Sequence, residues 1–415
     1  MGLMRPRAIF GKRGCGAVLL ICMILAWLMG PAIVKWQVRK SLADRNLGAA
    51  DSWLSRLEWL APNDAEAWFL RARLARKRGD WSHVRESLLK ARQLGVSVDR
   101  LEREQWLTLA QSGQMRLAEP HLSKLLTDPQ DDGAEICEAY VNGYFLNYRM
   151  TEALRLLDAW IADFPKDTEP RIIRGKIRID QQFLKEAEAD FRSAWTLDPQ
   201  STSAGLQLAD VLILERKIEE ALKVYQQLKQ QSAAHVNAQI GEAKALRLLN
   251  RPAAAGEIAR RILVQQPNNR EARLELALAE MDLEHLSEAV AILKQALQQN
   301  PRSLMVRQAL AKCLRATGNS EEAVEHAKYV EEAQAALQKA DALAMKVVEH
   351  PDDIRARYEI GMAFLKYAVP ERGIQWLKSV LNYDPNHEAA KRAIEAYHAS
   401  SPVPGDTETQ AEPQH

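Results

Sequence analysis

The sequence is short of the residues that build small, cross-linked or metal-bound folds. It has 4 cysteines in 415 residues, and Cys15 and Cys22 fall in one apolar N-terminal stretch. These are too few and too scattered for a disulfide framework or a zinc site. We expect the other two, Cys137 and Cys313, to be small buried side chains within helices. Basic and acidic residues number 56 and 55, and this balance gives no reason to expect a nucleic-acid partner.

Motifs that carry chemistry are also missing. The 9 histidines are dispersed, and none is paired at the spacing of a metal site. His387-Glu388 would open a zinc-protease motif, but Lys391 stands where the second histidine is needed. The sequence contains no Gly-x-Ser-x-Gly turn that could present a nucleophile. We therefore expect no catalytic residues, no metal, no cofactor and no enzymatic activity.

Long apolar runs are absent except at the N-terminus. After a basic segment at residues 1–13, residues 14–34 contain no charge. As a helix this run would be about 31 Å long, which matches the hydrocarbon core of a bilayer. The sequence predicts a single-pass transmembrane helix, a signal anchor, at 14–34. A cleaved signal peptide is the alternative, because Gly30-Pro31-Ala32 ends in a small residue.

The orientation of this anchor follows from the flanking charges. Lys35, Arg39, Lys40 and Arg45 follow the apolar run, so basic residues are about as frequent after it as before it. The positive-inside rule therefore nearly cancels. The free amino terminus and Asp44 favour a cytoplasmic N-terminus, which would place the rest of the chain on the non-cytoplasmic, periplasmic side of the membrane.

The rest of the chain is organised by a repeat. Ala187, Ala221, Ala255 and Ala289 are 34 residues apart, and three prolines keep one phase of this step. A fixed period of this length indicates a stacked array of supersecondary units. The same step is kept upstream of these alanines by Gly175, Ala209, Ala243, Ala277 and Ala311.

One period contains two amphipathic helices. In residues 270–303 the apolar residues of both halves recur at helical spacing. A short polar connector around His285 separates the halves, and Asn300-Pro301 ends the second one because proline lacks an N–H group. The small residues Ala277 and Ala289 allow the two helices to approach closely. A single hairpin cannot bury its apolar face, so neighbouring hairpins must stack.

This pattern resembles the tetratricopeptide repeat (TPR) family. The resemblance rests on series such as Gly175, Ala187, Phe191, Ala194 and Pro199, and it covers roughly residues 35–399. It implies an all-α fold, a right-handed TPR α-solenoid of about nine repeats, preceded here by the predicted transmembrane helix. The aromatic residue that is usual early in the first helix is mostly absent. The asparagine-containing carboxylate clamp of chaperone-binding TPR domains is not reproduced either, so that partner is not implied.

The repeat pattern divides the chain into segments. We expect an N-terminal helical hairpin at 35–62 and a TPR array at 63–351, with a degenerate copy and a one-residue slip between residues 95 and 128. No glycine or proline occurs at 320–350, which predicts one extended helix that would project beyond the stack by about 24 Å. A last repeat and a capping helix follow at 352–399. The polar tail at 400–415 is expected to be disordered.

The resemblance also implies a binding surface, because the first helices of successive repeats line a concave groove in this family. We expect the positions one and four after the small reference residue to face that groove, although Asp210 and Met281 interrupt the basic series. Repeated lysine and arginine residues there would suit an acidic peptide, a carboxylate terminus or an anionic polymer, with a solvated face as the alternative. The candidate residues are Arg73, Arg76, Lys176, Asp210, Lys244, Arg247, Lys312 and Arg315.

The sequence therefore predicts a membrane-anchored scaffold that binds protein or peptide partners, among which the basic series favours acidic ones, and that contacts the lipid bilayer through residues 14–34. Three alternatives stay open. The chain could belong to an envelope assembly or export system that handles polysaccharide or secreted protein, or it could be the accessory array of a multi-subunit enzyme. It could also be a structural oligomer built through the extended helix at 320–350.

Overall fold

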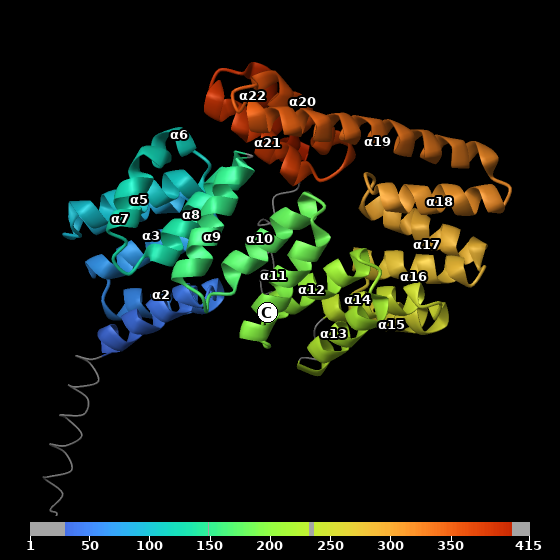
Figure 1. Ribbon diagram of the computed structural model, residues 1–415, viewed down its shortest axis with the longest axis horizontal. Helices are drawn as coiled ribbons and strands as arrows, with labels where there is room; N and C mark the ends of the chain where they lie inside the picture. Colours follow the sequence, from blue (N-terminus) through green and yellow to red (C-terminus); the bar gives the residue numbers. More distant parts are fainter. Residues whose placement is uncertain (1–29, 148, 232–235, 401–415) are drawn as a thin grey trace, which may run out of the picture. The chain divides into compact units, whose positions relative to one another are not determined.

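A computed structural model describes residues 30–147, 149–231 and 236–400 (Figure 1). Every regular element in these ranges is a helix, which confirms the all-α prediction. The chain divides into two compact units, the first ending at Gly143 and the second beginning at Tyr144. We describe each unit by itself.

The first unit begins with a helix whose described part covers residues 30–43. One buried cluster joins Val34, Val38 and Leu42 of this helix to Ala50 and Leu54 of the next helix. The predicted N-terminal hairpin is therefore a packed pair of helices. The later helices of this unit, with α8 crossing the boundary to the second, are α2 (Leu47–Leu60), α3 (Ala65–Arg78), α4 (Trp81–Gln93), α5 (Val98–Gln111), α6 (Met115–Ala118), η1 (Glu119–His121), α7 (Leu122–Thr127) and α8 (Gly133–Leu146).

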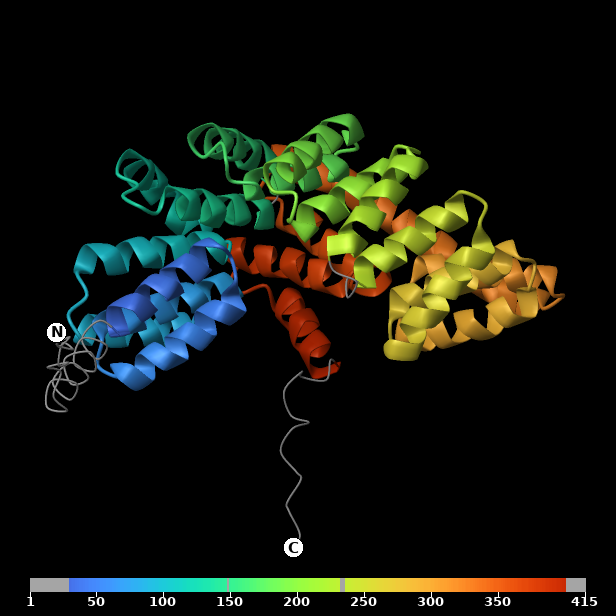
Figure 2. The ribbon, with the colours of Figure 1, turned by 90° about the horizontal axis from the view of Figure 1, so that it is seen from below.

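The second unit is a longer run of antiparallel helix pairs. Each helix from α10 to α18 packs on the helices before and after it in the sequence, and the pairs coloured yellow to orange lie side by side in Figure 2. Its helices are α9 (Met150–Asp163), α10 (Glu169–Asp180), α11 (Leu184–Leu197), α12 (Thr202–Leu214), α13 (Ile218–Gln231), α14 (Val236–Leu248), α15 (Pro252–Gln265), α16 (Arg270–Asp282), α17 (Leu286–Gln299), α18 (Leu304–Ala316), α19 (Ser320–Glu349), α20 (Ile354–Tyr367), α21 (Pro370–Tyr383) and α22 (Glu388–Ser400).

The turns inside the hairpins repeat with the same period as the core. In most of these turns one residue adopts a left-handed conformation, with φ between 55° and 88° over the set. In the second unit these residues are 34 positions apart and only the last is glycine: Gln182, Arg216, Asn250, Glu284 and Gly318. Side-chain N-caps keep the same phase at Ser201, Asn269 and Ser303. Each hairpin is therefore set by a turn and a cap as well as by its apolar face.

The core of the second unit is a seam of small residues opposed by rings. Ala187, Ala221 and Ala289 are fully buried, as the period predicts. The backbone of Gly175 lies against the ring of Phe191, and that of Gly241 lies against the ring of Tyr225, leaving no room for a Cβ at either glycine. This close approach explains why small residues recur at these positions of the 34-residue period. Cys137 and Cys313 are buried, which confirms their predicted packing role.

The degenerate copy is irregular in its second half. Its first helix, α5, is regular, and Gly113 keeps the left-handed turn. The second helix is then divided into α6, the 3-10 helix η1 and α7, because Pro120 cannot donate a backbone hydrogen bond. The slip in the period therefore falls after Gly113, within the copy in which the sequence placed it.

The extended helix is a single element, but it does not project freely. α19 contains 30 residues where the sequence predicts one continuous helix. Its first part contributes Ala323 to the cluster that includes Leu310 and Leu314 of α18. Its last part contributes Ala340 and Val347 to a second cluster. The expected 24 Å projection is therefore wrong, because the later apolar positions of α19 pack against the C-terminal repeat.

That C-terminal repeat also contacts the start of its own unit. Trp376 of α21 is 1% exposed and packs in a cluster that includes Met150 at the start of α9. Arg357 of α20 is fully buried, and its Nη2 donates a hydrogen bond of 3.2 Å to the carbonyl oxygen of Asn147. The second unit is thus joined by contacts between residues 210 positions apart as well as by contacts between neighbouring hairpins.

The predicted transmembrane helix at 14–34 lies mostly outside the described residues, as does the predicted tail at 401–415. Residues 30–34 are described, and Val34 is 8% exposed within the first hairpin cluster. Across residues 30–147, 149–231 and 236–400, no helix combines the length and the apolar character needed to cross a bilayer.

Candidate binding grooves

The second unit contains a groove between α16, α18 and α19, which we call the α16–α19 groove. It encloses about 510 Å³, within the range of ligand-binding clefts. Its lining combines apolar residues with two basic ones and a few other polar groups. The lining residues are Leu278, Met281, Met305, Gln308, Ala309, Ala311, Lys312, Arg315, Ala327, Val330, Glu331 and Gln334.

The repeat period explains why these side chains meet. Leu278 and Met281 stand one and four positions after Ala277, and Lys312 and Arg315 stand one and four positions after Ala311. Both alanines are buried in the packing between helices, so the positions that follow them lie along one edge. The period predicts the groove positions of Lys312 and Arg315. It gives no sign of Glu331 and Gln334, because α19 reaches the groove by packing back along α18.

The electrostatics of the α16–α19 groove favour an anionic ligand. Lys312 and Arg315 are exposed, and neither forms an ion pair with another described residue. Of the lining residues only Glu331 is acidic. Burial raises the pKa of the neighbouring Cys313 thiol, and the charge of Lys312 opposes part of this rise. The groove therefore offers two available cations beside the apolar side chains of Leu278 and Met281.

The other predicted residues of the second unit are not gathered in this groove. Arg247 is already paired, with its Nε 3.0 Å from Glu275 and its Nη1 3.5 Å from Asp282. The carboxylate of Asp210 accepts a hydrogen bond of 2.5 Å from the hydroxyl of Tyr225. Lys176 is exposed on α10 and Lys244 is half-buried on α14. Arg247 and Asp210 thus have structural partners that compete with any ligand.

Arg76, the predicted residue of the first repeat, is an interior side chain. It is 1% exposed, and its guanidinium contacts Glu104 at 2.5 Å and Glu135 at 2.6 Å. Its remaining Nη1 donates to the side chain of Gln111 at 2.7 Å. Arg76 therefore joins α3 to α5 and α8 and presents no cation to a ligand. The sequence could not show this, because its partners lie 28, 35 and 59 residues away.

Arg73 belongs to the same network. Its Nη2 lies 2.6 Å from Asp132, and its Nε lies 3.4 Å from Glu104. The network affects the acids that it holds. Burial raises the pKa of Glu135, but the charges of Arg73, Arg76 and Lys77 more than offset this effect and lower the pKa to about 2. We call this set the α3 ion-pair network: Arg73, Arg76, Lys77, Glu104, Asp132, Glu135 and Glu138.

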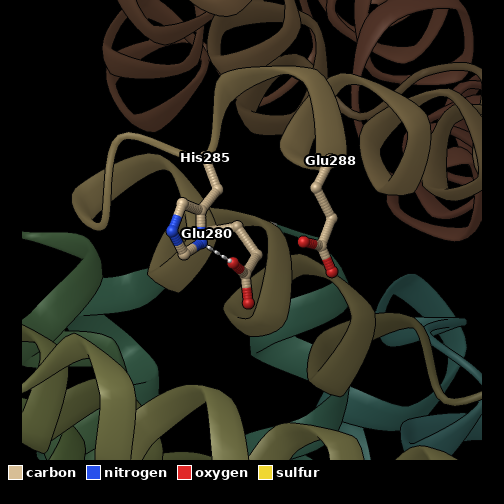
Figure 3. Close-up of side chains that lie close together, drawn as sticks. All are labelled: Glu280, His285 and Glu288. Carbon is tan, nitrogen blue, oxygen red and sulfur yellow. Dashed lines mark hydrogen bonds and ion pairs between the residues drawn. The ribbon is translucent and has the colours of Figure 1, made fainter.

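Three side chains of the second unit meet at metal-binding distances, Glu280, His285 and Glu288 (Figure 3). Their candidate ligand atoms lie within 4.8 Å of one another. Arg260 of α15 donates to one oxygen of the buried Glu280 carboxylate, and Nδ1 of His285 lies 2.7 Å from the other. Because Arg260 already neutralises Glu280, we assign these residues to an ion-pair cluster that joins α15 to α16.

Comparison with protein families supports the interpretation of the 34-residue period as tetratricopeptide repeats. A family model described as tetratricopeptide repeat matches residues 280–328. These residues run from the end of α16 through α17 and α18 into α19, so they include most of the residues that line the α16–α19 groove. This chain carries tetratricopeptide repeats. The left-handed turn residues show that the 34-residue spacing extends back at least to Gln182.

Among solved structures, the chain is similar to a tetratricopeptide repeat protein from Parabacteroides merdae, with 18% identity over 63% of this chain and 98% of that chain and a TM-score of 0.42. It is also similar to PilW, described as a type IV pilus biogenesis factor, with 18% identity over 46% of this chain and 90% of that one and a TM-score of 0.42. YrrB, a TPR protein described as having an unusual peptide-binding site, shows 15% identity over 58% and 97% of the two chains and a TM-score of 0.30. No curated protein matches the sequence.

Proposed function

We propose that the chain is a TPR scaffold that binds an acidic protein segment in the α16–α19 groove and has no catalysis of its own. The observation that carries this proposal is the pair of exposed cations, Lys312 and Arg315, which form no ion pair among the described residues and lie in a groove of about 510 Å³. TPR repeats commonly serve as protein-interaction modules, and an amphipathic segment laid in a groove is a common mode of peptide recognition.

The chemistry of the lining defines the segment. Lys312 and Arg315 would form charge-assisted hydrogen bonds with carboxylates. Leu278, Met281 and Met305 would contact an apolar face, and the flexible methionine side chains can adapt to different ligand shapes. We expect the ligand to carry carboxylates along one side and leucine-like residues along the other.

The test compares two charge-reversed double variants of the full chain. One carries Lys312→Glu and Arg315→Glu. The matched control carries Lys185→Glu and Lys223→Glu, which change two exposed lysines on second helices of the same unit. The probe is a labelled amphipathic peptide with glutamates on one face and leucines on the other, measured by fluorescence anisotropy, and a version with glutamine in place of glutamate is the ligand control.

We expect the groove variant to lose about 10- to 100-fold in affinity for the acidic peptide and the control variant to bind normally. Binding to the parent chain should weaken as salt is added, because the cations are exposed. Equal loss in both double variants, or equal binding of the glutamine peptide, would refute the assignment of the site.

The proposal includes a membrane tether at residues 14–34, with the repeats on the non-cytoplasmic side. Its support is the uncharged run of the sequence and the rule that about 20 apolar residues span a bilayer. A tether would hold the groove near the membrane surface and raise its effective concentration there. Carbonate extraction of membranes should retain the full chain and release a chain that lacks residues 1–34. Protease treatment of intact cells then reports the side.

A further inference from the structure

The first unit contains a cavity that the α16–α19 groove does not involve. It has a volume of about 340 Å³ and lies between α3, α5 and the segment before α8. Four arginines and four acidic residues surround it, so its overall charge is balanced. We call it the Arg103 cavity, and its lining residues are Arg39, Glu66, Phe69, Arg73, Arg100, Arg103, Glu104, Leu107, Gln130, Asp131 and Asp132.

Three of the four arginines already have acidic partners. Arg39 and Arg100 share the carboxylate of Glu66, at 2.9 and 2.8 Å, and Arg73 pairs within the α3 ion-pair network. Burial raises the pKa of Glu66, but the hydrogen bonds and charges of Arg100 and Arg39 lower it to about 2. Glu66 is thus ionised at neutral pH and fully engaged by two cations.

Arg103 is different. It is 5% exposed, and its Nη2 donates only to the carbonyl oxygen of Pro129, at 3.2 Å. Its buried Nε has no hydrogen-bond partner, and Arg103 forms no ion pair with any residue in the described part of the chain. Asp131 also lines the cavity, but it is exposed and lies beyond ion-pair distance of Arg103.

A buried guanidinium without a counter-charge is unfavourable, and buried charges in proteins are normally paired. The open space beside Arg103 is large enough for the missing anionic group. We propose that the Arg103 cavity binds one carboxylate, which would complete the hydrogen bonds of the Arg103 guanidinium. This carboxylate belongs to an acidic side chain, to a chain terminus or to a small free acid.

The walls of the cavity suit such a group. Two guanidinium groups contact the ring of Phe69, with Cζ of Arg100 4.2 Å and Cζ of Arg73 5.3 Å from the ring centroid. Phe69 and Leu107 therefore provide an apolar surface for the carbon chain that carries the carboxylate. The planar guanidinium of Arg103 can donate two parallel hydrogen bonds to the oxygens of one carboxylate.

The experiment uses isothermal titration calorimetry with the full chain. Three probes separate the possible sources of the carboxylate: free glutarate, a blocked short peptide with one glutamate and an amidated end, and a short peptide without glutamate that keeps a free C-terminal carboxylate. The variant is Arg103→Met, which keeps a similar length without charge. The control is Arg85→Met, at an exposed arginine on α4 that lies outside the cavity.

We expect at least one probe to bind the parent chain and the Arg85→Met control equally, and to bind Arg103→Met at least tenfold more weakly. Arg103→Met without ligand should unfold no more easily than the parent, because it removes an unpaired buried charge. If Arg103→Met does not fold, Arg103→Lys takes its place, and the loss of the planar fork should weaken binding while the fold is kept.

Two results would overturn the proposal: no binding of any of the three probes to the parent chain, or unchanged binding to the Arg103 variant. Loss of peptide binding at Lys312 and Arg315 has no bearing on this test, because those residues belong to the other unit. The two proposals can therefore fail independently.

Discussion

The two units of this chain differ in how far charged side chains contribute to the contacts between their helices. In the first unit, α3 is held to α5 and α8 by charged groups, including Arg76 and Glu104, each 1% exposed. In the second unit the buried contacts from α10 to α14 are made mainly by alanine, glycine and rings such as Phe191 and Tyr225. A regular small-residue period can be read from the sequence, whereas an interior built from ion pairs cannot.

The largest expected effect concerns the charged interior of the first unit. Glu104→Ala would leave Arg76 and Arg73 short of a buried counter-charge, and we expect a loss of about 3–5 kcal/mol in the free energy of unfolding of this unit. Glu102→Ala is the control, because Glu102 is exposed on the same helix. Urea unfolding followed by circular dichroism measures the loss, and hydrogen exchange locates it.

If Glu104→Ala were as stable as Glu102→Ala, the α3 ion-pair network would not support the first unit. The contrast between the two units would then be wrong, because apolar contacts within each unit would account for the stability of both.

A smaller effect is expected at the small-residue seam of the second unit. Gly241→Ala would place a Cβ only 2.2 Å from Cε1 of the Tyr225 ring, and the resulting overpacking should destabilise the unit by about 1–3 kcal/mol. Gly256→Ala is the matched change, since its Cβ would meet its nearest atom, Nη1 of Arg260, at 3.5 Å. There the better helix propensity of alanine should stabilise α15 by up to about 1 kcal/mol.

Thermal unfolding monitored by circular dichroism decides between these signs. Two changes of the same sign would mean that close helix approach does not determine which positions of the repeat must be small.

The smallest effect concerns the turns, in which the units also differ. The first unit has glycine at three of its five described left-handed positions, whereas among the described residues of the second only Gly318 is glycine and the others are Gln182, Arg216, Asn250 and Glu284. Since a left-handed conformation strains any residue with a Cβ, Arg216→Gly should raise the free energy of unfolding by about 0.5–1 kcal/mol. Gly79→Ala should lower it by about 1–2 kcal/mol. Chemical denaturation measures both, and a destabilising Arg216→Gly would contradict this account of the turns.

Much of the fold could be predicted because the repeat is local. The helix pairs, the buried alanines and the groove positions of Lys312 and Arg315 follow from a 34-residue period and helical geometry. The period says which side of a helix faces inward, and this is sufficient where successive hairpins are alike.

The roles of Arg76 and Arg103 could not be predicted in the same way. Arg76 occupies a groove-facing position by count, but acids from two later helices pair with it and bury it. Arg103 lies in a repeat whose second helix is broken at Pro120, where the period gives no guide to packing. The sequence also could not show that the end of α19 packs with α20 and α21, because that contact depends on the path of the whole unit.

The length of α19 has a consequence for how the protein melts. In an array whose hairpins touch only their neighbours, one end can unravel while the rest stays intact. α19 is one uninterrupted helix of 30 residues that places Ala323 in one cluster and Val347 in another. A break in this helix would weaken both clusters together. The C-terminal repeat is therefore expected to unfold in a single cooperative step with α17 and α18, instead of unfolding first as the terminal repeat of the array.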